Sequence, residues 1–248
     1  MVLPVAAKAG PRKDKMKKIR QFLFEVIKTV LRFFKRRPVV IDLSAKLKGA
    51  RLLIANHSAA NGPFTLELYF PYKFRPWGAH EMCGPYMERW HYLYDVFYRQ
   101  KLRFSKLKAF LIATPFAVIS RFLYREAGLI PTYQDMRMKT AFTESLKAMS
   151  EDEENILIFP ENSSDGYHDV LKEYHPGFVK LAKLFYKRVG RDVPICAVYY
   201  SGRQNRMVID EPVYLHKLFA DGALQTDRQV AEYFKNRTNR LAKEYSLN

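Results

Sequence analysis

The chain has 248 residues, of which 48% are hydrophobic and 27% charged, and these proportions exclude a wholly disordered or low-complexity protein. The two cysteines, Cys83 and Cys196, lie far apart without a CxxC spacing, which argues against a disulfide framework and favours a reducing compartment. The net charge of +17 indicates an anionic partner, and +10 of it lies in residues 1–37.

The sequence of the N-terminal region predicts a disordered tail at residues 1–14 and an amphipathic helix at residues 15–38. Apolar residues recur at steps of three and four from Lys15, and Pro38 ends the pattern. A basic helix with a Phe-rich face is typical of helices that lie in a membrane interface. We therefore expect residues 15–38 to bind an anionic membrane surface; the alternative is a helix packed on its own domain with a solvated basic face. The predicted membrane-binding residues are Phe22, Leu23, Lys28, Arg32, Phe33 and Phe34.

A second apolar stretch covers residues 109–120, between Lys108 and Arg121. Twelve uncharged residues are too few to cross a bilayer. The preferred interpretation is a buried core helix; the alternative is an element that lines an acyl-chain tunnel or dips into the bilayer. We therefore expect a peripheral protein on the cytoplasmic face of a membrane.

The remainder, residues 39–248, alternates short apolar runs with longer amphipathic ones. Strands are predicted at 52–55, 78–83, 128–133, 155–159, 193–200 and 207–209. Helices are predicted at 63–73, 86–103, 106–126, 135–150, 176–188 and 226–245. Strands separated by helices predict a single α/β domain with a mostly parallel central sheet flanked by helices.

Two predicted strand ends carry polar clusters, which is where sites gather in open α/β folds. Asn56 and His57 follow the strand at 52–55. Residues 160–166 (Pro-Glu-Asn-Ser-Ser-Asp-Gly) follow the strand at 155–159.

These clusters resemble motifs of the lysophospholipid (1-acylglycerol-3-phosphate) acyltransferase superfamily. Asn56-His57 is similar to its Asn-His-x4-Asp motif, and residues 159–165 are similar to Phe-Pro-Glu-Gly-Thr-Arg-Ser. Residues 193–198 (Val-Pro-Ile-Cys-Ala-Val) resemble a later Val-Pro-Ile motif. The resemblance covers about residues 52–215 and implies an acyltransferase-like domain.

The chain departs from the family pattern at three positions. Gly62 stands where the first motif has Asp, and Gln134 and Ser164 stand where the family has two arginines associated with the acceptor phosphate. The resemblance therefore implies an acceptor other than lysophosphatidic acid.

Acyl transfer from a thioester to an alcohol needs a base, a group that orients the base, and donors for the developing oxyanion. The resemblance makes His57 the candidate base, since an unperturbed imidazole titrates near neutral pH. Three residues are candidates for the group that orients the His57 ring: Glu81, which lies in the predicted second strand, Asn61 and Glu67. We expect a hydrogen bond between Glu81 and His57.

The resemblance places Glu161 at the acceptor site, and Asn162, Ser163 and Ser164 could donate hydrogen bonds to a polar head group. The alternative for these three residues is turn formation. Histidines and carboxylates show no metal-ligand spacing, so no metal site is predicted, and no cofactor is expected beyond acyl-ACP or acyl-CoA as co-substrate.

The leading hypothesis is a membrane-associated O-acyltransferase that moves an acyl chain from acyl carrier protein or CoA to a lipid hydroxyl. The alternative is a lipid-binding pseudoenzyme of the same fold, because Gly62 replaces the motif acid. Nucleic acid is not expected as a partner, since most of the excess charge lies on one Phe-rich amphipathic helix.

Overall fold

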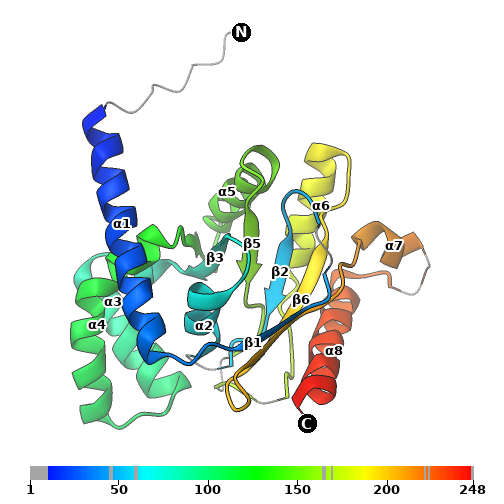
Figure 1. Cartoon of the computed structure of the whole chain (residues 1–248). Helices are drawn as coiled ribbons and strands as arrows, with labels where there is room; N and C mark the ends of the chain where they lie inside the picture. The colour runs from blue at the N-terminus through cyan, green and yellow to red at the C-terminus, as the bar shows by residue number, and fades with distance from the viewer. Residues whose placement is uncertain are drawn as a thin grey trace. The chain divides into compact units, whose positions relative to one another are not determined.

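A computed structural model describes residues 11–44, 47–58, 61–163, 166–168, 170–220, 222 and 224–246. The chain divides into two compact units, Met1–Arg36 and Arg37–Asn248. The described part of the first unit contains helix α1 (Pro11–Phe34) (Figure 1). The helix begins four residues earlier than predicted, whereas residues 1–10 of the predicted tail lie outside the described residues. Phe33 and Phe34 are 86% and 80% exposed, so α1 presents large apolar side chains to solvent.

The second unit contains a seven-stranded sheet in the order β1-β7-β6-β2-β5-β3-β4. Its strands are β1 (Val39–Asp42), β2 (Leu52–Ala55), β3 (Phe74–Ala79), β4 (Ile130–Thr132), β5 (Asn155–Ile158), β6 (Ile195–Ser201) and β7 (Arg206–Ile209). All neighbouring strands are parallel except β6 and β7. Figure 1 shows β2 in the middle of the sheet between β5 and β6. The predicted α/β architecture with a mostly parallel sheet is confirmed.

Helices connect most of these strands. They are α2 (Asn61–Tyr69), η1 (His80–Cys83), α3 (Tyr86–His91), η2 (Tyr92–Lys101), α4 (Lys106–Glu126), α5 (Met138–Glu151), α6 (Gly177–Val189), α7 (Leu215–Ala220) and α8 (Asp227–Ser246). The predicted strand at 78–83 is wrong, because β3 ends at Ala79 and Glu81 lies on the 3-10 turn η1. Strand β3 has the sequence FRPWGA, in which Arg75 and Pro76 interrupt the apolar run that signals a strand. Sequence patterns also missed the short elements β1 and α7.

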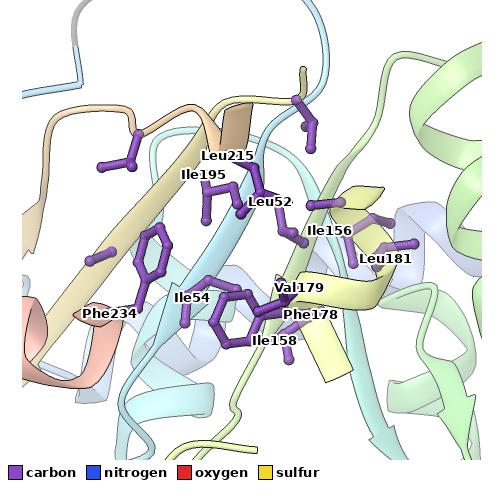
Figure 2. Packing of buried hydrophobic residues seen from close by; sticks show 14 of the residues in the cluster. Leu52, Ile54, Ile156, Ile158, Phe178, Val179, Leu181, Ile195, Leu215 and Phe234 are labelled. Atoms are coloured by element: carbon purple, nitrogen blue, oxygen red, sulfur yellow. The ribbon is translucent and has the colours of Figure 1, made fainter. Parts of the chain in front are cut away.

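The central strands are buried on both faces, which explains why they are continuously apolar. Leu52 and Ile54 pack with α5, α6 and α8 on one face, whereas Leu53 and Ala55 pack with α2 on the other. Figure 2 shows the first of these clusters, with Ile54 and Ile158 gathered around Phe178. This packing fixes the positions at which β2 and β5 end.

Helix α4 belongs to a smaller helical layer together with η1, α3 and η2. One side of α4 is built from Ala109, Ala113 and Ala117, which are fully buried against Met82 and Leu93. Large apolar side chains on α4 are instead exposed: Leu107, Phe110, Leu111, Val118 and Ile119. The preferred interpretation of a buried core helix is therefore wrong for these exposed positions.

By length and composition alone, α4 is apolar enough to cross a membrane, and 22% of its most apolar window is buried. The expectation that this stretch is too short to span counted only the uncharged residues 109–120. The helix itself has 21 residues and extends past Lys108 and Arg121.

Candidate active site

The candidate site lies where four parallel strands end at one edge of the sheet. His57 follows β2, Glu161 follows β5, Gly202 follows β6 and His80 follows β3. Strands β6, β2, β5 and β3 are successive neighbours, so their carboxyl ends meet at this edge.

Asn56 sets the direction in which the chain leaves β2. Its amide Nδ2 donates to the Tyr200 carbonyl over 3.0 Å, and its Oδ1 accepts the Tyr200 N–H over 2.8 Å. This buried side chain thus bonds to both backbone groups of a β6 residue, as a strand residue would, while the main chain turns away. Ser58, two residues later, has a positive φ of 42°, a conformation that non-glycine residues adopt in tight turns. Asn56 therefore anchors the turn that presents His57.

Glu161 holds the backbone of His57 from the neighbouring strand. Its Oε2 accepts the His57 N–H over 3.1 Å, and the side chain is buried. Burial raises the pKa of Glu161, although the N–H groups of His57 and His168 and the charge of Lys101 act in the opposite direction. Glu161 thus ties the turn after β2 to the segment around His168. This role was not predicted; contact of Glu161 with an acceptor stays a prediction.

Two aromatic rings lie against the imidazole of His57. The Tyr167 ring is stacked on it, with ring centroids 4.4 Å apart and an interplanar angle of 22°. The Phe159 ring lies 5.1 Å away at 54°. Tyr167 Oη is 3.4 Å from His57 Nε2, at the long limit for a hydrogen bond. Tyr167 was missed by sequence reasoning, because it lies 110 residues from His57 and only the fold brings them together.

Gly62, the second residue of α2, lies directly against the His57 backbone. A Cβ atom at this position would be 2.2 Å from the His57 carbonyl oxygen and 2.8 Å from its carbon. Any side chain is therefore excluded without a shift of α2 or of the turn after β2. Asn61 precedes it at the start of the helix and lies near Gly202, where its Nδ2 is 3.8 Å from the Cβ position of that glycine.

The carboxylate of Glu81 lies beside a neighbouring side chain on η1. Its Oε2 is 3.2 Å from His80 Nδ1, and His80 Nε2 in turn is 3.9 Å from Glu88. A hydrogen bond between Glu81 and His57 stays a prediction. Glu67 lies on α2 and is half-buried.

The residues after Glu161 build a turn. Asn162 pairs with Glu173 through its backbone N–H at 3.1 Å and its side-chain amide at 2.9 Å. The Ser163 carbonyl accepts the Gly166 N–H over 3.2 Å, and Gly166 has a φ of 106°, which favours glycine. These contacts agree with the alternative of turn formation for Asn162 and Ser163; Ser164 lies outside the described residues. The turn leads into Tyr167.

A half-buried lysine, Lys101 at the end of η2, adds positive charge near this edge. Burial lowers the pKa of Lys101, while the charges of Glu161 and Glu81 raise it. Its Nζ lies 5.9 Å from the centre of the Tyr167 ring. Burial also raises the pKa of Tyr92 to about 12, and the charge of Glu81 acts in the same direction. Tyr167 therefore has Lys101 and the neutral phenol of Tyr92 among its neighbours.

The positions that match the two family arginines lack a cation. Gln134 is exposed, and Arg137, three residues further on, pairs with Asp135 over 2.8 Å. Arg137 also lies over the Tyr133 ring at 4.4 Å. Among the residues that the structure describes, no group of three or more histidines, cysteines and carboxylates could hold a metal ion.

Comparisons with known proteins support the architecture. No protein-family model matches the sequence, and no curated protein matches it. Among solved structures, the chain is similar to the 1-acyl-sn-glycerophosphate (LPA) acyltransferase PlsC from Thermotoga maritima, with a TM-score of 0.53 and 12% identity. The match covers 98% of this chain and 85% of that one. The chain therefore has the fold of a lysophospholipid acyltransferase, as the strand-end motifs implied.

Proposed function

We propose that this protein is an O-acyltransferase that moves an acyl chain from a thioester to the hydroxyl of a lipid. The observation that carries the proposal is the placement of His57 at the strand-end edge. Asn56 anchors the turn below it, Glu161 holds its backbone N–H, and Tyr167 and Phe159 contact its ring. A histidine fixed in this way is suited to general-base catalysis.

In the proposed reaction, a ring nitrogen of His57 takes the proton of the acceptor hydroxyl as its oxygen attacks the thioester carbonyl carbon. The carbonyl oxygen becomes an oxyanion, which hydrogen-bond donors at the strand ends stabilise. The carbon–sulfur bond then breaks, and the leaving thiolate takes the proton from the imidazolium. The products are an ester and the free thiol of CoA or of acyl carrier protein.

The acceptor in this proposal does not carry a phosphomonoester. A phosphomonoester is best held by charge-assisted hydrogen bonds, above all from arginine. Gln134 supplies no charge, and the charge of Arg137 is already engaged by Asp135. A hydroxyl on an uncharged or zwitterionic lipid fits this set of residues better.

Membrane association would bring the site to its lipid acceptor. Two helices have exposed side chains that support membrane association. Helix α1 combines exposed Phe33 and Phe34 with the basic residues of the N-terminal region. Helix α4 exposes Leu107, Leu111 and Val118 between the basic residues near its ends. We propose that both rest in the cytoplasmic interface of an anionic membrane.

A lipid-binding protein without transferase activity is the second candidate, favoured by the absence of a carboxylate at position 62. The two candidates differ in a direct assay. Purified protein is incubated with a lipid extract and labelled acyl-CoA or acyl-ACP, and the labelled product is identified. A labelled lipid ester supports the transferase, whereas lipid binding without any transfer from either donor supports the second candidate.

A further inference from the structure

The stacked pair of Tyr167 and His57 has a chemical consequence for a base that must become protonated. In acyl transfer, the base passes through a cationic imidazolium state, which another group normally stabilises. The family motif places an Asp at the position of Gly62. In this chain that position faces the His57 carbonyl group, and a Cβ atom there would lie 2.2 Å from the oxygen. The stabilising group must therefore come from elsewhere than position 62.

The geometry of the pair suits this role. The two rings are nearly parallel, with centroids 4.4 Å apart, so Tyr167 covers one face of the imidazole. The lone pair of an imidazole nitrogen lies in the plane of its ring, so a neighbour stacked on the face leaves that direction accessible. A cation over the face of a tyrosine is attracted by the ring quadrupole, more strongly where water is excluded.

The surroundings of Tyr167 keep the ring neutral and in place. Burial raises the pKa of its phenol, so the hydroxyl stays protonated. The Ser163–Gly166 turn precedes it, and Lys101 Nζ lies 5.9 Å from its ring centre. A carbon placed at Gly166 would touch the Lys101 carbonyl at 3.5 Å, so the turn packs closely against the end of η2.

We propose that Tyr167 is a positioning residue that holds the His57 ring by stacking and stabilises its protonated form, in place of a carboxylate at position 62. The catalytic consequence rests on the proposed acyl transfer, whereas the stacking itself does not. The 3.4 Å contact from Tyr167 Oη to His57 Nε2 is secondary in this proposal, because it lies at the limit of hydrogen-bond length. Removing the hydroxyl and removing the ring should therefore have different effects.

The variants Tyr167→Phe and Tyr167→Leu separate these effects. A control is Tyr186→Leu, because Tyr186 and His216 form another Tyr–His ring contact, with centroids 3.7 Å apart and an interplanar angle of 33°. The first readout is the NMR signal of the His57 ring protons, assigned with His57→Gln in the full chain. Loss of a stacked ring changes the ring-current shift of its neighbour, so Tyr167→Leu should move the His57 signal, and Tyr186→Leu should move that of His216 alone.

The second readout is steady-state acyl transfer. Tyr167→Leu should lower kcat about tenfold, within the range of about two- to thirtyfold that a cation–π contact spans, with little change in KM for the acyl donor. Tyr167→Phe should retain kcat to within about threefold. A Leu variant with the kcat of the unchanged protein, or with an unmoved His57 signal, overturns the proposal.

If Tyr167→Leu fails to fold, Tyr167→Phe still separates the role of the ring from that of the hydroxyl, because it keeps the ring. A loss of tenfold or more in Tyr167→Phe would assign the effect to the hydroxyl and overturn the stacking role. If the unchanged protein transfers no acyl group, the proposed function fails, while the NMR comparison still tests whether Tyr167 holds the His57 ring.

Discussion

Placing an acidic residue at position 62, where the resembling motif has Asp, should inactivate this protein. By motif alone, Gly62→Asp would complete the Asn-His-x4-Asp pattern and raise activity. The structure predicts the opposite, because a Cβ atom would lie 2.2 Å from the His57 carbonyl oxygen and ordinary contact begins only at 3.4 Å. The two groups must separate by roughly 1 Å in a close-packed interior, and both are backbone atoms that no rotamer change can relieve. The shift would fall on the turn that carries His57.

Gly62→Ala isolates this steric effect from the added charge. Replacing a helical glycine by alanine normally stabilises a protein by about 0.5–1 kcal/mol. Overpacking against rigid neighbours costs about 1–3 kcal/mol. The sign of the change in the free energy of unfolding therefore shows whether steric overlap or the loss of glycine's backbone freedom dominates at position 62. We expect net destabilisation by about 1–2 kcal/mol, which for a chain of this size lowers Tm by roughly 2–8 °C.

A glycine at the start of another helix serves as the control. A Cβ atom at Gly177, the first residue of α6, would meet Trp77 only at 3.8 Å. Gly177→Ala should therefore leave Tm unchanged or slightly raised. Thermal unfolding and acyl transfer are measured for all three variants. A Gly62→Asp protein with unchanged Tm and higher turnover would refute the steric account of position 62.

Three further results are expected. Asn56→Ala removes both hydrogen bonds to the buried backbone of Tyr200 and should lower the free energy of unfolding by about 2–4 kcal/mol; denaturant titration that finds no loss would contradict its anchoring role. Because the folded pKa of Glu161 is raised, the fold favours its protonated form, and this stabilisation is present below the unfolded pKa and lost as pH rises through the folded pKa. Glu161→Gln should therefore flatten that decline in unfolding experiments at pH values above the ordinary pKa of a glutamate, and an unchanged dependence of stability on pH would count against it. Replacing Leu111 and Val118 together by Asp should reduce flotation with anionic liposomes several-fold at unchanged Tm. Undiminished flotation of this variant would show that α4 does not contact the membrane.

The sequence patterns located two central strands, β2 and β5, to within one residue. Leu52–Ala55 and Ile156–Ile158 are continuous apolar runs because helices cover both faces of the central strands, and so they stand out in the sequence. Strand β3 was misplaced because the polar residue Arg75 interrupts its apolar pattern. The Arg75 side chain does not pack in the core but donates hydrogen bonds to the Gly128 carbonyl and to Glu144. A local pattern carries no information on such distant partners.

The candidate site was predictable as far as its strand ends. Motif order and strand-end position singled out His57 and Glu161 as candidate site residues, whereas the hydrogen bond from the His57 N–H to Glu161 was not predicted. The exclusion of a side chain at Gly62 depends on how closely α2 approaches β2, which no spacing reveals. Tyr167 directly follows the sequence Ser-Asp-Gly, a composition that indicates a surface loop, so only the folded chain shows its ring against the base.

The most direct test of the central claim is the transfer of a labelled acyl group from a thioester to a lipid hydroxyl, with release of one thiol for each ester formed. The unchanged protein and His57→Ala are compared with His91→Ala, whose exposed ring pairs with Asp95 on the separate helical layer. The account predicts transfer by the unchanged protein and by His91→Ala, and a loss of about a hundredfold or more in His57→Ala. Transfer by His57→Ala at the rate of the unchanged protein would contradict it.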